Sequence, residues 1–326
     1  MPSLLRKTLY SFSLLLGVSF ISFMLMVYFG PDRSYSLAGK NPSQSQLEEI
    51  RTQLGYDRPM LSRYGQYLRQ LSSLDLGRSE SSGKLVTTLI SETLPVSLQL
   101  LLPGFLLGNL IALLLAMVTA WYRQQWPDRL LTSLSMVGVS ISFIIVVFAL
   151  SVWLSTPQGL NLFPSRGWRV DGISSWFTYA TVPSLALIFA TVFFNLRFYR
   201  ALLIDEMEQD YIRTAKAYGA GPAGILVTEA LPNILIPVLT RLLFSLPAIM
   251  VSGSLVLESF FGIPGIGKLS YDAIINADQP VLNAVVSLSA ILIIIVSWLL
   301  DILYPRLDPR IATGISIYNA TSGKQL

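Results

Sequence analysis

Long apolar runs constrain this chain more than any other feature of its sequence. They occupy approximately residues 8–29, 94–121, 130–154, 181–198, 233–257 and 282–303. A helix needs about 20 apolar residues to cross a hydrocarbon core about 30 Å thick, and these runs approach or exceed that length. Only 13% of the 326 residues are charged, where about 25% is usual for soluble domains. The sequence therefore predicts an all-α, polytopic membrane protein with six transmembrane helices.

Composition disfavours several classes of enzyme. The chain contains no cysteine and no histidine, which excludes disulfides, Cys/His zinc sites, histidine bases and Ser-His or Cys-His nucleophile pairs. Glu258 and Asp301 lie near opposite ends of different predicted spans, so they do not form the facing acid pair of an intramembrane aspartyl protease. The net charge of +4 fits Lys and Arg flanking membrane spans better than nucleic-acid binding.

The first 30 residues are interpreted as the N-terminus and first transmembrane helix. Arg6 and Lys7 precede the run at 8–29, and residues 36–38 (Ser-Leu-Ala) resemble a signal-peptidase site. A cleaved signal has an apolar region of roughly 7–15 residues, whereas this run is about 22 residues long and lies well upstream of that site. A retained first span is therefore favoured over a signal peptide.

Residues 31–93 are polar and predict an extracytoplasmic loop with two short amphipathic helices. Their apolar positions recur at helical spacing and are Leu47, Ile50 and Leu54, then Leu61, Tyr64, Tyr67, Leu68 and Leu71. The second helix is interpreted as packing on the membrane domain; the alternative is a gate or docking surface on the outer side.

Six spans place both termini on one side of the membrane. The termini and loops on that side hold eleven Lys and Arg, whereas the two short loops opposite hold only Arg166, Arg169 and Lys268, and the long loop at 31–93 holds eight more. The loop at 31–93 is long enough to escape the positive-inside rule. Both termini are therefore predicted to be cytoplasmic, with a core domain at 94–305 and a cytoplasmic tail at 306–326.

The polar stretch 205–232 between the fourth and fifth runs predicts a helix, a bend and a second helix. Acidic residues such as Asp210 suit a helix start, Gly219 suits its end, and Pro222 suits the first position of the next helix. The second helix is expected to continue past Pro232, with a kink, into the fifth span. Small residues such as Ala215 would let the first helix lie in a partner's groove; the alternative is a solvated connector.

The sequence GIPGIGK at 262–268 resembles a phosphate-binding loop but is rejected as one. That motif requires Ser or Thr after the lysine, a preceding strand and a following helix. Leu269 follows the lysine here, and the predicted topology places the stretch outside the cell. No ATP site is therefore expected in this chain, and a Gly/Pro turn is the favoured interpretation.

Arg241 lies about eight residues into the predicted fifth span, about 12 Å along the helix axis. A cation at such depth faces a cavity or a partner, or extends to the membrane boundary. A boundary or structural ion-pair role is the first interpretation, and a place in a translocation pathway is the second.

Four stretches together resemble one transporter family. Ala215, Gly219 and Leu231-Pro232 resemble the cytoplasmic "EAA" loop of permease subunits of ABC importers. LGYDRP (54–59) with DLGRS (75–79), ESFFGIPGIGKL (258–269), and DILY (301–304) with LDPR (307–310) resemble the peptide (oligopeptide/dipeptide/nickel) branch. Two positions depart from the family pattern: Arg213-Thr214 replaces Glu-Ala, and Asp278-Gln279-Pro280 replaces part of an RDYP sequence.

The resemblance implies an inner-membrane permease that imports peptides or similar small solutes. Its implied partners are a second similar permease, two ATPases and an extracytoplasmic binding protein, with ATP and Mg²⁺ bound by the ATPases and no cofactor bound by this chain. The implied ATPase-coupling residues are Asp210, Tyr211, Arg213, Ala215, Lys216, Gly219, Leu231 and Pro232. A secondary transporter, for which the spans offer few acids, and an export subunit remain the alternatives.

Overall fold

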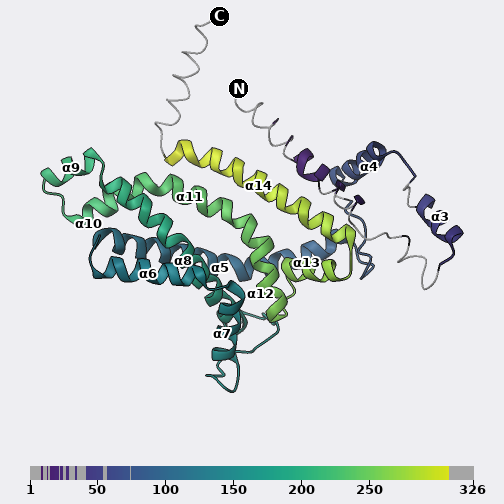
Figure 1. The fold of residues 1–326 in the computed structure, drawn as a ribbon, viewed down its shortest axis with the longest axis horizontal. Helices are drawn as coiled ribbons and strands as arrows, with labels where there is room; N and C mark the ends of the chain where they lie inside the picture. The colour runs from purple at the N-terminus through teal and green to yellow at the C-terminus, as the bar shows by residue number, and fades with distance from the viewer. Residues whose placement is uncertain are drawn as a thin grey trace, which may run out of the picture. The chain divides into compact units, whose positions relative to one another are not determined.

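The computed structural model describes residues 42–53, 57–73 and 75–307, together with isolated positions between 9 and 34. Within these residues the chain is nearly all helical (Figure 1), with one isolated antiparallel bridge between Arg78 and Leu85. The predicted first span as a continuous helix, position Leu54, the side chain of Leu71 and the tail beyond 307 lie outside what the structure describes.

The bounds of the helices follow the chain. They are α3 (Gln44–Gln53), α4 (Met60–Ser72), α5 (Val86–Trp121), α6 (Trp126–Ser140), α7 (Phe143–Ser155), α8 (Ile173–Met207), α9 (Asp210–Ala217), α10 (Pro222–Gly224), π-helix η1 (Ile225–Ala230), α11 (Leu231–Ala248), π-helix η2 (Ile249–Gly253), α12 (Ser254–Phe261), α13 (Ile266–Ile275) and α14 (Gln279–Leu307).

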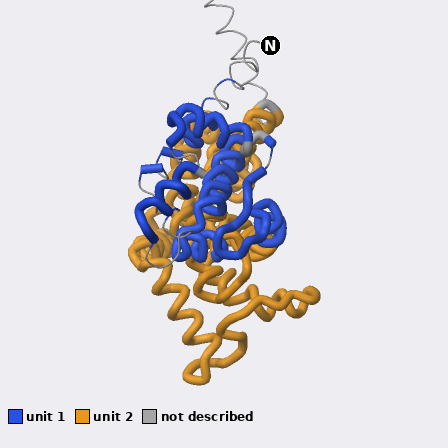
Figure 2. Tube along the Cα trace, turned by 90° about the vertical axis from the view of Figure 1, so that its right-hand side faces the viewer, with its two compact units in different colours: residues 1–95, 268–294 blue, residues 96–267, 295–326 orange. Residues whose placement is uncertain are grey.

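The chain divides into two compact units, coloured separately in Figure 2. Unit 1 comprises residues 1–95 and 268–294, and unit 2 comprises residues 96–267 and 295–326. The loop and helices predicted to carry function, from α5 onward to α12, lie mainly in unit 2.

Within the part of the chain that the structure describes, four helices are long and apolar enough to cross a membrane. They are Val86–Trp121, Ile173–Met207, the continuous helical stretch Ile225–Phe261, and Gln279–Tyr304. The pair α6 and α7 would make a fifth span if its two bent halves are counted as one. The described residues thus bear out a multi-pass helical protein.

Two contacts in unit 2 indicate whether the bent pair of helices α6 and α7 crosses the membrane. The indole of Trp176, near the start of α8, donates to the carbonyl of Gln99 in the first half of α5 at 3.1 Å. Arg123, just after α5, pairs with Glu208, just after α8, at 2.6 Å. Helices α5 and α8 therefore run parallel, so α6 and α7 must return the chain from the end of α5 to the start of α8. The pair is one broken span rather than a loop that re-enters and leaves on the same side.

The prediction of one continuous helix over 130–154 is wrong. Helices α6 and α7 meet at 98°, because Ile141 and Ser142 take extended ψ values of 127° and 134°. Two extended residues interrupt the i→i−4 hydrogen-bond ladder. The helix restarts at Ser142, whose carbonyl accepts the N–H groups of Ile145 and Val146.

Unit 1 contains the outer-loop helices predicted at 47–54 and 61–71. Leu47 on α3 is buried. On α4, the Tyr64 hydroxyl donates to the carbonyl of Leu16 at 3.0 Å, and the Tyr67 hydroxyl lies 3.1 Å from that of Ser287 on α14. The predicted packing of α4 through its apolar face is confirmed for these tyrosines but not for Leu61, which is 81% exposed.

Candidate functional site

The 205–232 stretch folds as its local sequence predicts. Helix α9 spans Asp210–Ala217, and Gly219 follows with φ +85°, a left-handed conformation that glycine adopts without steric cost. Helix α10 then starts at Pro222. Instead of a break at Pro232, the chain forms the π-helix η1, in which the N–H of Leu231 bonds to the carbonyl of Leu226. A widened turn thus precedes the proline, whose ring would clash within a regular α-helix.

Helix α9 is fixed to unit 2 through an apolar face. Ile212 is fully buried in a cluster with Leu203 of α8 and with Ile225 and Leu226 of η1. Ala215 packs against the same cluster. The small side chain of Ala215 therefore allows close packing of α9 on the chain's own core, and its place in a partner's groove stays a prediction.

Tyr211 adds a polar anchor to α9. Its hydroxyl donates to the Glu206 carboxylate near the end of α8 at 2.5 Å, and accepts from the Asn233 amide at the start of α11 at 2.7 Å. Burial, reinforced by the bond to Glu206, raises the pKa of Tyr211 to about 12. The phenol therefore stays protonated at neutral pH and acts as a donor, so α9 is held to both flanking helices.

The remaining predicted coupling residues lie around this anchor. Asp210, Arg213 and Lys216 are exposed on α9, with Arg213 3.1 Å from Asp210. Leu231 packs against the apolar cluster, whereas Pro232 is exposed. The structure therefore brings the charged members to one solvent-accessible surface and separates Leu231 from them.

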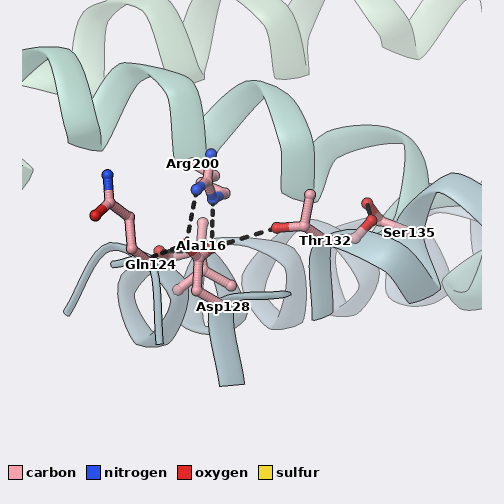
Figure 3. Close-up of polar contacts among 7 residues, drawn as sticks. Ala116, Gln124, Asp128, Thr132, Ser135 and Arg200 are labelled. Carbon is pink, nitrogen blue, oxygen red and sulfur yellow. Dashed lines mark hydrogen bonds and ion pairs between the residues drawn. The ribbon is translucent and has the colours of Figure 1, made fainter. Parts of the chain in front are cut away.

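An ion pair that the sequence analysis missed joins α6 to α8 in the same unit. The Arg200 guanidinium bonds both oxygens of Asp128, through Nε at 2.6 Å and Nη2 at 2.8 Å (Figure 3). The carboxylate also accepts the N–H of Gln124 at 2.8 Å and the hydroxyl of Thr132 at 3.3 Å. The Asp128 side chain is only 4% exposed, so this bidentate pair fixes the start of α6 against α8.

Arg241 belongs to a polar chain that crosses three long helices. Its Nε donates to the Asn195 side-chain carbonyl of α8 at 2.8 Å. The Asn195 amide donates to the Asn109 carbonyl of α5 at 2.9 Å, which also accepts the Tyr199 hydroxyl at 2.6 Å. Asn109, Asn195 and Tyr199 are buried. The helical stretch that contains Arg241 begins at Ile225 rather than near 233.

The backbone N–H groups of the GIPGIGK turn bond within the chain itself. It follows a helix, α12, rather than a strand. The fully buried carboxylate of Glu258 accepts the N–H of Gly267 at 2.7 Å and the Ser97 hydroxyl at 2.6 Å, and the Ser97 oxygen in turn accepts the N–H of Ile266 at 2.8 Å. The backbone donors of the turn are thus already used, which supports its rejection as a nucleotide site.

Asp278, which the sequence did not indicate as a site residue, joins two segments of unit 1 by hydrogen bonds. Its buried carboxylate accepts the hydroxyls of Ser79 at 2.6 Å and Ser81 at 2.8 Å. Burial raises the pKa of Asp278, but these bonds and the N–H groups of Ser81 and Glu80 outweigh it and lower the pKa. Ser79 closes the DLGRS stretch, so its bond to Asp278 joins two segments singled out in the family comparison.

Comparison with known proteins gives consistent matches over most of the chain. The sequence profile of the family described as "binding-protein-dependent transport system inner membrane component" matches residues 108–313, and the N-terminal profile of the same class matches residues 1–101. A Brucella abortus (strain 2308) protein named as a peptide transport system permease is 33% identical over 94% of this chain and 98% of its own length. The glutathione transport system permease GsiC of Escherichia coli O6:H1 is 30% identical over 90% and 93%.

A solved structure shares the fold. The chain is similar to one from the inward-facing MetNI methionine ABC transporter, with a TM-score of 0.55 and 20% identity over 68% of this chain and 97% of that one. Taken with the apolar helices and the two profile matches, this protein is a multi-pass inner-membrane protein and belongs to the family of binding-protein-dependent transport system inner membrane components.

Proposed function

We propose that this chain is one of two related permease subunits of an ATP-driven importer of peptides or similar small solutes. The names of the relatives, a peptide and a glutathione transport permease aligned over at least 90% of this chain, support the solute class. The observation that carries the mechanism is helix α9, anchored to the chain's own core on one side and charged and exposed on the other.

In this proposal α9 is the coupling helix that docks on a separate ATPase. ATP and Mg²⁺ bind to the two ATPases, which carry out hydrolysis, and this chain supplies no catalytic residue. Closure of the ATPase pair on ATP pushes α9. Because Ile212 and Tyr211 fix α9 to α8 and α11, the push displaces those helices rather than bending α9 alone.

The pair between Asp128 and Arg200 extends this connection to α6. A displacement of α8 carries the start of α6 with it, since the bidentate contact restricts both distance and angle. The pathway between the two permeases would open outward as these helices tilt, and release after hydrolysis would reset it.

The proposed topology has six spans, the five of the described residues preceded by residues 8–29. Both termini and α9 are cytoplasmic. Residues 31–93 form the extracytoplasmic loop, 94–305 the core with the coupling stretch 205–232, and 306–326 the tail. An extracytoplasmic binding protein delivers the solute to the outer side.

Cross-linking tests the coupling role of α9. The chain has no cysteine, so Tyr218→Cys, at a position 89% exposed beside α9, introduces its only thiol. In the assembled transporter we expect this thiol to cross-link to a cysteine placed in the ATPase cleft. The matched control is Leu61→Cys, at an 81% exposed position on α4, which should not react with the same cleft. Failure of Tyr218→Cys to cross-link would argue against docking through α9.

Two rival functions are separable by transport assays. A secondary transporter would stop when the proton gradient is collapsed, whereas the proposed importer continues as long as ATP is present. An exporter built from the same parts would accumulate solute in the opposite direction in inverted membrane vesicles.

A further inference from the structure

Arg241 lies deep within a membrane span. It is 16 residues after Ile225 and 20 before Phe261, the ends of that helical stretch, or about 24 and 30 Å at 1.5 Å per residue. A cation near the middle of a membrane-crossing helix lies within the hydrocarbon core, so its charge requires compensation near its own level.

The contacts of Arg241 compensate that charge only in part. Its guanidinium carbon lies 4.8 Å from the ring centroid of Phe194 and 4.2 Å from that of Phe198, and Nε is bonded to Asn195. Among the described residues no carboxylate pairs with it. Cation–π contacts attract a cation but bring no negative charge to neutralise it.

The polar chain beneath Arg241 holds the side chain in one orientation. The side-chain amide of Asn195 donates to Asn109, and this bond orients the Asn195 side-chain carbonyl toward Nε of Arg241. Asn109 is fixed in turn by two hydrogen bonds: its side-chain carbonyl accepts the Tyr199 hydroxyl, and its side-chain amide donates to the backbone carbonyl of Phe105. The guanidinium is therefore preorganised, with the two Nη groups free of hydrogen bonds to the described residues.

We infer that Arg241 is a transit site for the carboxylate of the solute, an inference that rests on the proposed import of peptides. The paired N–H groups of a guanidinium match a carboxylate in a bidentate geometry, and every peptide with a free C-terminus carries such a group. Arg241 is half-buried and the neighbouring Phe194 is 60% exposed, so the site opens at the surface of this chain.

The aromatic contacts favour a transient anion over a permanent one. Two phenyl rings and one amide moderate the charge while the site is empty, without occupying the Nη groups. A carboxylate fixed on a second permease subunit would make that arrangement unnecessary. The site is thus suited to alternate between empty and occupied states during transport.

The test compares two solutes in the complete transporter, reconstituted with its partner permease, ATPases and binding protein. The solutes are radiolabelled trialanine and its C-terminal amide, and the variants are Arg241→Gln, Arg241→Lys and Asn195→Ala. Arg197→Gln is the matched control, because Arg197 is an exposed cation on the same helix as Asn195. Comparing variants with the same binding protein cancels the preference of that protein for either solute.

We expect Arg241→Gln to lower uptake of trialanine at least about tenfold relative to the native complex while uptake of the amide changes little, as for loss of a hydrogen bond to a charged group. Arg241→Lys should retain part of the preference for the free acid, Asn195→Ala should weaken it, and Arg197→Gln should keep it. Assembly with the ATPases, measured by co-purification, should be unchanged throughout.

Three results would overturn the inference. Equal loss of both solutes in Arg241→Gln, with impaired assembly, would assign Arg241 to the contact between permeases. An unchanged preference for the free acid would remove it from the pathway. Absence of peptide uptake by the native complex, with ATPase activity intact, would refute the proposed function and this inference with it.

Discussion

Glu258 illustrates how much a single residue decides in this protein. Its carboxylate accepts the N–H of Gly267 and the hydroxyl of Ser97, groups 9 and 161 residues away along the chain. Such a buried acid is stable only when its oxygens are bonded. The turn at 262–268 can approach the Glu258 carboxylate closely because residue 265 is glycine. A Cβ on Gly265 would lie 2.3 Å from that carboxylate.

Replacing Gly267 by Ala should destabilise the protein by about 1–3 kcal/mol or more. An added Cβ would lie 2.3 Å from the N atom of Leu255 and from the carbonyl carbon of Ser254, and backbone atoms cannot move aside easily. Alanine favours helices over glycine, so the loss would come from the clash alone. The control is Gly253→Ala, whose nearest contact is an ordinary 3.4 Å; thermal unfolding in detergent measures both, and equal midpoints would refute the prediction.

Asp278 should contribute stability that depends on acid pH. Its pKa is lower in the folded protein than its ordinary value of 3.8, so the folded state favours the carboxylate. That contribution is complete above pH 3.8 and is lost as pH falls through the lowered pKa. Asp278→Asn should therefore be less stable than the native protein at neutral pH, and the difference should shrink below pH 3.8. Unfolding midpoints of both proteins measured across this pH range test the prediction. A difference between them that stays constant with pH would contradict it.

At the scale of elements, α9 depends on its neighbours for its position. A helix of eight residues is too short to be stable alone in water. Ile212 and Tyr211 attach it to α8, η1 and α11, and these contacts let a small surface helix transmit force.

Tyr211→Phe should weaken coupling while leaving the fold intact. The substitution removes the bonds to Glu206 and Asn233, worth about 1–3 kcal/mol together, but keeps the ring. We expect less solute transported per ATP hydrolysed in the reconstituted transporter. Tyr218→Phe is the matched control, since Tyr218 is 89% exposed. If both variants had the same transport-to-hydrolysis ratio, the anchoring role of Tyr211 would be excluded.

Two ion pairs near the C-terminal end of α8 should differ in strength. The pair of Asp128 with Arg200 is bidentate and largely buried, whereas Arg123 and Glu208 are 42% and 59% exposed. Asp128→Asn should cost about 2–3 kcal/mol, and Glu208→Gln about 1 kcal/mol or less. Unfolding midpoints in detergent measure the difference, and equal shifts would be inconsistent with this assignment.

At the scale of the whole molecule, the parallel course of α5 and α8 sets the path of the chain. The contacts of Gln99 with Trp176 and of Arg123 with Glu208 require the broken α6–α7 pair to cross back between them. The loops after α5 and after α8 thus lie on one side, and the loop between α7 and α8 lies on the other.

Labelling of single cysteines tests this path and its orientation. An impermeant maleimide added outside should label Gln158→Cys, in the α7–α8 loop. Gln125→Cys and Tyr218→Cys should be labelled only after the membrane is disrupted, because both positions are proposed to be cytoplasmic. Labelling of Gln125→Cys and Tyr218→Cys from opposite sides would show that α6 and α7 do not cross together.

The sequence by itself determined the class of protein and the local form of the 205–232 stretch. Apolar length decides whether a helix can cross a bilayer, and Gly219 and Pro222 act on the backbone next to them, so both can be interpreted without knowing the rest of the fold. The helix, bend and second helix were predicted correctly for this reason.

Only the tertiary structure decided where that stretch is attached and which side chains meet. The inward packing of Ala215, the pair of Asp128 with Arg200 and the contact of Glu258 with Ser97 join residues that periodicity does not relate. The break at Ile141 also escaped the sequence, because an apolar β-branched residue is compatible with both helical and extended backbone. These features depend on packing between distant segments, which a local pattern does not encode.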